Sequence, residues 1–421
     1  MALTDIKHSL RKFEFPVCAK EALIRIEQLL VSRVAPTNKQ VDISMDIIAE
    51  FIFWEMDRRG NRRSTGLSPL QELQLIDIIC DYLSTCANET TKNTIFLSLF
   101  GGQESQRRLK VLSILASMAV SASSTPVLLA VGVWLQQMGC SSPQSLQLAE
   151  NIIRDHFFLN TSNQRVLKSL ATTAPQFVSN FITAVTELYM HDEQGSNNMP
   201  PRNLLEVITS WVYTNPTLCM SAQLNAAALP NGAIPMAAVT PLAGLIHWCA
   251  LAPLYVKDEA DDKEESTKVK RIKLEHEREL TVKPVRKPAR EAEVYMMLQL
   301  GVLQSLRAAR RPPGAPCAVS AQQLAALAPR LAAAACRVQP SPAALQLSNN
   351  VCALSLLKSK NIDDLMMVSL QDCLDRIGQA VQVALANGCV YGNISNLLAA
   401  LDTLPENRLL RIIIKTHQQS I

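Results

Sequence analysis

The sequence predicts an all-α protein, built as an α-solenoid or an irregular, HEAT-like helical stack that a disordered charged linker interrupts. Three observations favour helices. The 421 residues include many Leu and Ala but only 14 Gly, and this composition suits helices better than strands. Apolar residues recur at helical spacing along most of the chain, without a convincing alternation of period two. Short segments containing Pro, Asn, Ser and Gly separate the helical patterns.

The best-defined helix start is the segment SPLQELQLIDIICDYL, which begins at Ser68. A serine at this place can cap the first turn, Pro69 suits the first helical position, and Gln71 can reach back to complete a capping box. We therefore expect a helix whose buried stripe is formed by residues three or four positions apart. Those residues are Leu73, Ile76, Cys80 and Leu83.

Other helices are predicted from apolar stripes and from residues that favour helix starts. Leu23, Ile26 and Leu30 fall on one face of an early helix. A long helix is expected to open at Asn361, because the acidic residues that follow it suit the positive end of the helix dipole. Further starts are expected at four places: Ser142, Pro175, Pro201 and Pro405.

Two long segments contain no Asp, Glu, Lys or Arg: Val111–Ala149 and Val207–Val256. A membrane-spanning helix needs about 20 apolar residues in one continuous stretch. The second segment offers fewer, because Pro241 and Pro253 bracket only eleven residues. We expect no membrane span, and we interpret both segments as buried or partner-facing helices. In the second, the apolar face is predicted to contain Leu242, Leu245, Ile246 and Cys249.

The charged segment at residues 257–290 is predicted to divide the chain. It begins acidic, becomes basic and has few large apolar residues, so it cannot offset the entropy that ordering costs. We expect an N-terminal helical domain at 1–256, a flexible linker at 257–290 and a C-terminal helical region at 291–421. The role of the alanine-rich residues 307–350 within the last region stays open.

A short basic run in this linker, at Lys270, Arg271 and Lys273, is typical of nuclear-import signals. The alternative is a linker that its charges merely keep solvated. The net charge of the whole chain is only +4, which argues against a dedicated nucleic-acid-binding protein. Direct contact with RNA through the basic linker remains a second possibility, although no aromatic residue is interleaved there for base stacking.

No catalytic, metal or cofactor site is predicted. The eleven cysteines are scattered without a C-x-x-C motif, and the six histidines are dispersed. His247 and Cys249 are too close in sequence to share one helical face, so they are poorly placed as a catalytic pair. A hydrolase that uses a Cys or Ser with a distant His is the least favoured alternative. Three tryptophans amid aliphatic residues are predicted to be packing or interface anchors: Trp134, Trp211 and Trp248.

Several segments, taken in order, resemble the Integrator complex subunit 15 family. The most recognisable is TPLAGLIHWCALAPL at 240–254. The others are SPLQELQLIDIICDYL at 68–83, IFLSLF at 95–100, TPVLLAVGVWLQ at 125–136, ITAVTELY at 182–189, PPRNLLEVITSWVYTNP at 200–216 and GQAVQVALANG at 378–388. The sequence departs from the family pattern in its charged linker, in the alanine-rich region, and in lacking a proline- and histidine-rich tail found in some members.

The resemblance implies a non-catalytic helical subunit of a nuclear assembly, without a cofactor. Integrator binds RNA polymerase II, cleaves nascent transcripts including small nuclear RNA precursors, and attenuates transcription. Subunit 15 is associated with the peripheral module that contains subunits 10, 13 and 14. The implied partners are therefore other Integrator subunits and, indirectly, RNA polymerase II, and the implied location is the nucleus.

Overall fold

The computed structural model describes residues 3–31, 36–101, 105–159, 164–190, 199–223, 240–255, 290–308, 319–338 and 353–419. In this part of the chain the all-α prediction is confirmed, since helices form nearly all regular structure. The only described strands, β1 (Val319–Ser320) and β2 (Val390–Tyr391), pair in parallel over two residues each. The expected linker, and with it Lys270, Arg271 and Lys273, lies outside the described residues.

The chain folds into two compact units, and each combines two stretches of sequence. Unit 1 contains Met1–His191 and Leu218–Pro241, and unit 2 contains Asp192–Thr217 and Leu242–Ile421. This division differs from the expected domain end at residue 256. The physical reason is the packing of α11 (Arg202–Thr214) and α12 (Leu242–Tyr255), which contact later helices of unit 2. Gly301 shows how closely: a side chain there would lie 3.2 Å from Val212 of α11.

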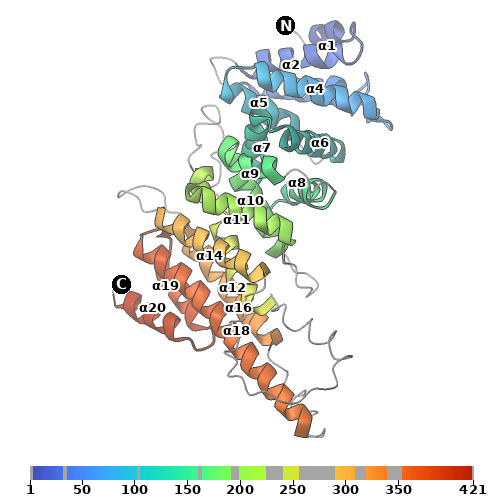
Figure 1. Ribbon diagram of the computed structural model, residues 1–421. Helices are drawn as coiled ribbons and strands as arrows, with labels where there is room; N and C mark the ends of the chain where they lie inside the picture. The colour runs from blue at the N-terminus through green and yellow to red at the C-terminus, as the bar shows by residue number, and fades with distance from the viewer. Residues whose placement is uncertain are drawn as a thin grey trace, which may run out of the picture. The chain divides into compact units, whose positions relative to one another are not determined.

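Unit 1 is a stack in which most helices pack on helices two or three places away in the chain, such as α4 on α6 and α7, and α10 on α7 and α8 (Figure 1). Its helices are α1 (Leu3–Leu10), α2 (Val17–Leu30), α3 (Asn38–Ile47), α4 (Pro69–Thr85), α5 (Glu89–Phe100), α6 (Gln106–Ala122), α7 (Thr125–Met138), α8 (Pro143–Ile153), α9 (Gln164–Thr173) and α10 (Pro175–Met190). Two π-helical turns, η1 (Ile48–Ile52) and η2 (Arg154–Leu159), extend α3 and α8, and the 3₁₀ helix η4 (Pro216–Gln223) spans the unit boundary.

The capping box predicted for α4 is confirmed. The Ser68 Oγ accepts a hydrogen bond from the Gln71 backbone N at 3.3 Å, and the Gln71 side chain accepts one from the Ser68 N at 2.9 Å. The predicted stripe is wrong at Leu73, which is 51% exposed. Because α4 contacts α2, α6 and α7, its buried face is broader and lies toward Leu75 and Ile79, which join Ile76 and Leu83.

The first uncharged segment folds into a buried helical layer, as expected, although it contains parts of three helices rather than two: α6, α7 and α8. Close packing of α7 explains why it carries a glycine in mid-helix. A Cβ at Gly132 would lie only 2.9 Å from the Phe177 backbone N of α10. The Gly132 carbonyl accepts a further bond, at 2.9 Å, from Asn180 of the same helix.

Unit 2 is built around long helices, of which α18 is the longest at 34 residues. Besides α11 and α12 it contains α14 (Arg290–Ala308), α15 (Ala321–Ala325), α16 (Leu327–Val338), α18 (Ala353–Ala386), α19 (Ile394–Asp402) and α20 (Arg408–Gln418). The expected start at Asn361 is too late, because the good helix formers of ALSLLKSK precede it and α18 begins at Ala353. Pro405 lies before α20 rather than opening it, and Asn407 is the N-cap, accepting a bond from the Leu410 N at 3.0 Å.

The second uncharged segment contains part of α11, η4 and all of α12, and α12 is buried on every side. Every residue from 241 to 252 is buried, so the prediction of a single apolar face at Leu242, Leu245, Ile246 and Cys249 was too narrow. A helix that is apolar all round belongs in a protein core or in a membrane. Here α14, α16 and α18 pack around it, and none of the described helices is long and apolar enough to cross a bilayer.

Pro253 does not end α12, which continues to Tyr255. A proline has no N–H, so the carbonyl four residues earlier, that of Cys249, loses its usual helical donor. Arg376 of α18 replaces that donor: its Nη1 donates to the Cys249 carbonyl oxygen at 3.1 Å. Gln299 of α14 in turn donates to the Arg376 carbonyl oxygen at 3.2 Å. Three helices are thereby linked at the point where α12 is weakest.

This arrangement predicts a coupling between Arg376 and Pro253. Arg376→Met should lower the free energy of unfolding by about 1–3 kcal/mol, because it leaves a buried carbonyl without a donor. In a Pro253→Ala background the loss should be clearly smaller, since residue 253 then supplies its own N–H. Chemical denaturation of the four proteins measures the coupling. Arg408→Met, at an exposed position of α20, is the control. Equal losses in both backgrounds would contradict the explanation.

Candidate functional site

The Cys–His pairing considered for a hydrolase does not have the chemistry of an activated nucleophile. Both His247 and Cys249 are buried in α12. Burial, with a smaller contribution from Arg330, lowers the pKa of His247 to about 4. Burial raises the pKa of Cys249 to about 12. At neutral pH the imidazole is uncharged and the thiol keeps its proton, the reverse of what nucleophilic cysteine catalysis needs.

A second cluster, which the sequence did not reveal, brings Ser117 of α6 beside Asp155 and His156 of η2. The Ser117 Oγ donates to the Asp155 Oδ2 at 2.8 Å and lies 3.1 Å from the His156 Nε2. The same nitrogen lies 3.1 Å from the Ser117 carbonyl oxygen. In a catalytic triad the carboxylate orients the histidine, whereas here it binds the serine. Burial lowers the pKa of His156, and the cluster fits a contact that fastens η2 to α6.

The described residues also lack a metal-binding group. No set of three or more His, Cys, Asp or Glu side chains within the described ranges is placed to hold an ion. Cys18, Cys140 and Cys373 are buried thiols without a disulfide, and burial raises the pKa of each. Their protonated, enclosed state fits packing rather than metal ligation.

The three tryptophans singled out in the sequence lie inside the two units rather than on a surface. Trp134 of α7 and Trp211 of α11 are 1% exposed, and Trp248 of α12 is 2% exposed. The Trp134 Nε1 donates to the Phe100 carbonyl oxygen of α5 at 3.0 Å. Their burial fits the packing half of the prediction, and it leaves no exposed ring for direct contact with a partner.

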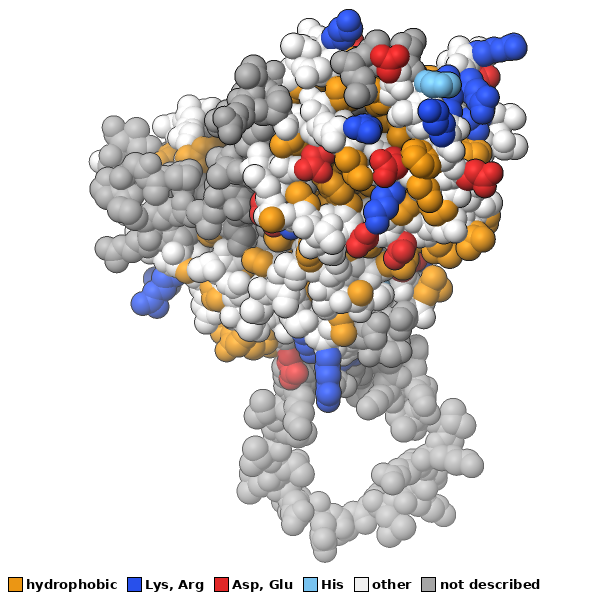
Figure 2. All heavy atoms as spheres, turned by 90° about the horizontal axis from the view of Figure 1, so that it is seen from above, with side chains coloured by type: hydrophobic (Ala, Val, Ile, Leu, Met, Phe, Trp, Pro, Cys, Tyr) orange, Lys and Arg blue, Asp and Glu red, His pale blue; other side chains and the backbone are white. Residues whose placement is uncertain are grey.

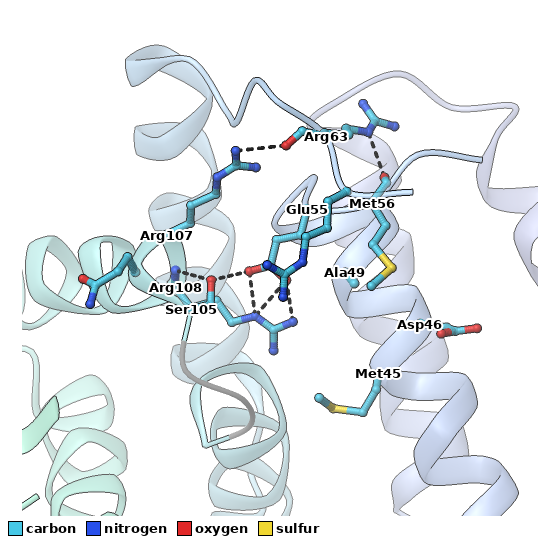
Figure 3. Close-up of a pocket in the computed structure, with 11 residues that line it drawn as sticks. Met45, Asp46, Ala49, Glu55, Met56, Arg63, Ser105, Arg107 and Arg108 are labelled. Atoms are coloured by element: carbon cyan, nitrogen blue, oxygen red, sulfur yellow. Dashed lines mark hydrogen bonds and ion pairs between the residues drawn. The ribbon is translucent and has the colours of Figure 1, made fainter. Parts of the chain in front are cut away.

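One pocket of unit 1 gathers several charged side chains and has a volume of about 520 Å³. Three segments form its wall (Figure 3): the α3–η1 helix with Met45, Asp46 and Ala49, the connection from η1 to α4, and the start of α6. The connection from η1 to α4 and the start of α6 contribute most of the charged side chains: Glu55, Arg62, Arg63, Arg107 and Arg108. We call this the arginine pocket.

The connection that carries three of these charged side chains, residues 54–66, folds back on itself as a short hairpin. Met56 and Arg62 form an antiparallel bridge. The Asp57 carboxylate accepts hydrogen bonds from the backbone N of Arg59 at 2.8 Å and of Asn61 at 2.9 Å, as in an Asx turn. Gly60 sits in the turn at φ 81°, a conformation that glycine adopts without strain. The hairpin is therefore shaped by its own residues.

The base of the arginine pocket is a nearly buried ion pair. Arg108 donates from Nη2 to the Glu55 Oε2 at 2.6 Å and from Nε at 3.1 Å, and the Ser105 Oγ donates to the Oε1 at 2.5 Å. Burial alone would raise the pKa of Glu55, but the bonds from Arg108 and Ser105 outweigh it and hold that pKa below its usual value. The carboxylate is thus ionised and fully occupied by the pair.

Exposed apolar side chains mark another surface of unit 1. Val17 and Ile24 of α2, and Val31 just after it, are 51%, 39% and 38% exposed and recur every seven residues, which places them on one helical face. Leu70 and Leu73 of α4 are 67% and 51% exposed. Figure 2 looks onto the N-terminal end of unit 1 and shows that hydrophobic side chains lie between charged ones at this end.

The burial of His247 predicts a pH dependence of stability. The unfolded chain takes up a proton on this histidine near pH 6.5, whereas in the fold its pKa is about 4. The neutral side chain therefore contributes stability above pH 6.5 that is lost as the pH falls toward 4. Between pH 7.5 and 5, this group should cost the protein about 2 kcal/mol of unfolding free energy.

His247→Leu should remove that part of the pH dependence, as measured by chemical denaturation at both pH values. His8→Leu, at an exposed position of α1, is the matched control and should leave it unchanged. If wild type and His247→Leu showed the same pH dependence, the histidine would not be held neutral by its surroundings.

Known proteins resemble this chain over nearly its whole length. A family model described as Integrator complex subunit 15 matches residues 4–406. Integrator complex subunit 15 of Drosophila melanogaster is 35% identical over 435 aligned positions, covering 100% of both chains. The Homo sapiens protein of that name is 29% identical, covering 98% of this chain and 87% of its own length. This chain therefore belongs to the Integrator complex subunit 15 family.

Proposed function

We propose that this chain is a non-catalytic scaffold subunit of the nuclear Integrator complex. In this proposal it connects the peripheral module of subunits 10, 13 and 14 to the rest of the complex, and through it to RNA polymerase II, in small nuclear RNA processing and transcription attenuation. The observation that carries the proposal is the family match along residues 4–406. Relatives that align over nearly the full chain bear the name of an Integrator subunit.

The packing and the protonation states within the two units support a role in holding other proteins in place. Many of their large side chains, including Trp134, Trp211 and Trp248, are used in packing, and the Cys–His and Ser–His–Asp groupings lack the geometry or the protonation states of a catalytic site. The large apolar side chains that stay exposed lie on several elements, and those at helical spacing on α2 and α4 are among them. Such residues are the usual anchors by which one helical protein binds another.

Three sequence predictions continue as parts of this proposal. Nuclear entry through Lys270, Arg271 and Lys273 depends on a segment outside the described residues. The same holds for the flexible linker of residues 257–290, which we propose to separate the helical regions at 1–256 and 291–421 along the chain. Trp248→Ala should weaken folding first and partner binding as a consequence, because this side chain is enclosed in α12.

A second candidate function is that of an RNA-binding adaptor that uses the basic part of the linker. The sequence observation that favours it is the run from Lys268 to Arg290, with its excess of Lys and Arg. Crosslinking to RNA that disappears when these residues are deleted, with the helical units intact, would support the adaptor over the scaffold.

The scaffold proposal predicts that the full chain captures Integrator subunits from nuclear extract, with subunits 10, 13 and 14 among those identified by mass spectrometry. Ile24→Asp places a charge on the exposed face of α2 and should reduce recovery at least about tenfold if this face is an anchor. Met118→Asp, also at an exposed apolar position, is the matched control. Thermal melting of both variants checks their folding. Recovery of no Integrator subunit by the folded wild-type chain would contradict the proposal.

A further inference from the structure

We propose that the arginine pocket of unit 1 is a docking site for an acidic segment of a partner protein, one in which carboxylates alternate with apolar side chains. This inference names a surface and the chemistry of its occupant, and it does not depend on which subunits the scaffold connects. It rests on the charges that line the pocket, on how those charges are held, and on the apolar residues between them.

The pocket holds more positive charge than its own carboxylates neutralise. Glu55 is occupied by Arg108, with its closest contact at 2.6 Å, and Asp46 lies 3.3 Å from Lys7. Among the described residues, no carboxylate lies within ion-pair distance of Arg62, Arg63 or Arg107. Glu55 and Asp57 act on Arg107 and Arg63 only from beyond that distance, so three guanidinium groups line one small cavity without a direct ion pair. Like charges gathered in this way favour an anion that can bind more than one of them.

Two of the three arginines are held in position before any ligand arrives. The Arg63 Nε donates to the Met56 carbonyl oxygen at 2.8 Å, and its guanidinium lies 4.4 Å from the centre of the Trp54 ring. The Arg107 Nη2 donates to the carbonyl oxygens of Arg63 and Ser64, both at 3.1 Å. Figure 3 shows the Arg107 side chain reaching the backbone of Arg63, whose own side chain turns toward Met56. Fixed donors lose little entropy on binding, so this geometry favours affinity.

Arg62 completes the group from the same hairpin, and its side chain is exposed. Arg58 and Arg59 lie in the exposed turn of that hairpin and extend the positive charge beyond the pocket. The start of α6 lies on the opposite wall, where Ser105 is the N-cap, and the positive end of that helix dipole adds to the same field. An extended acidic chain can therefore be attracted along the hairpin before it enters the cavity.

The remaining lining distinguishes a peptide from a nucleic acid. Met45, Ala49 and Met56 form the apolar part of the wall, and flexible methionine side chains adapt to the apolar side chains of a peptide. A single-stranded nucleic acid needs aromatic faces for its bases. Trp54 does not offer a free face. The Arg63 guanidinium lies over its ring, and the Phe15 ring packs against it in a T-shaped arrangement with ring centres 6.1 Å apart.

The test uses the purified full chain and a fluorescent peptide in which pairs of Asp or Glu alternate with Leu. The same peptide with Asn and Gln in place of the acids measures the charge requirement, and a single-stranded RNA of equal net charge measures preference for nucleic acid. We expect saturable binding of the acidic peptide, weakened by salt, and at least tenfold weaker binding of the neutral peptide and of the RNA.

Arg62→Gln should lower the affinity for the acidic peptide about tenfold, which corresponds to the loss of one charge-assisted hydrogen bond. This exposed side chain makes no described bond to the fold, so the melting temperature should not change. Arg107→Gln should act similarly, with melting measured beside it because Arg107 also supports the hairpin. Arg165→Gln, which removes an exposed charge of α9 outside the pocket, should bind as wild type does.

Three results would overturn the proposal. Equal binding of the acidic and neutral peptides would show that the arginines do not bind the carboxylates of the peptide. Tighter binding of the RNA would assign the site to nucleic acid. The chain carries its own acidic run at residues 258–265. If the peptide bound only after that run had been changed to Asn and Gln, the occupant would be this chain rather than a partner.

Discussion

The constraint on which unit 2 depends is that α12 has no polar side. A helix of this kind cannot rest on a surface, because any face left in water would expose several large apolar side chains. It has to be enclosed, and α14, α16 and α18 enclose it. The charge-free helix α12 thus lies at the centre of these contacts, and α11, from the stretch that precedes it in the chain, joins the unit by packing on α14.

Enclosure creates a second requirement, which concerns the backbone. Pro253, which is half-buried, removes the helical donor for the buried Cys249, and the guanidinium of Arg376 supplies the missing bond to the Cys249 carbonyl. An arginine from another helix is suited to this because its long side chain presents several fixed donors. The apolar packing and this hydrogen bond therefore depend on each other, because the helix can be buried only if the Cys249 carbonyl has a donor in place of the missing backbone N–H.

The sequence predicted local features well and relations between distant segments poorly. The capping box at Ser68 could be predicted because the residues that form it are neighbours in the chain. The wrong face at Leu73 and the narrow face assigned to α12 have one cause: periodicity identifies an apolar stripe, but only the packed neighbours decide how wide the buried side is. The unit boundary escaped prediction because it depends on α11 meeting α14, about ninety residues later in the numbering.

The same limit applies to the candidate sites. The arginines of the hairpin stand close together in the sequence, but Ser105, Arg107 and Arg108 are forty or more residues away from them. Only the fold shows that Glu55 is used up by Arg108 while the other guanidinium groups remain available. Likewise, the sequence predicts Trp134, Trp211 and Trp248 as packing or interface anchors, and only the fold shows that all three side chains are buried. Within one helical turn, some side chains can be buried while others are exposed.

A protein organised in this way separates two tasks. The interior supplies rigidity through apolar packing, and in our proposal binding is left to exposed side chains, including those on α2 and α4, and to the arginine pocket. Neither task needs a reactive group, which agrees with the raised thiol pKa values and the neutral buried histidine. For a scaffold, rigidity matters because each side chain that is fixed in advance reduces the entropy lost when a partner binds.

Hydrogen–deuterium exchange of the full chain in detergent-free buffer tests the central claim most directly. If α12 is enclosed by its own chain, amides 245–252 should exchange only through global unfolding of unit 2, as slowly as those of the buried residues Cys373, Leu374, Ile377, Ala380 and Val381 of α18. Rapid exchange of α12 while α18 stays protected would contradict the account, as would protection that appeared only after detergent or lipid was added.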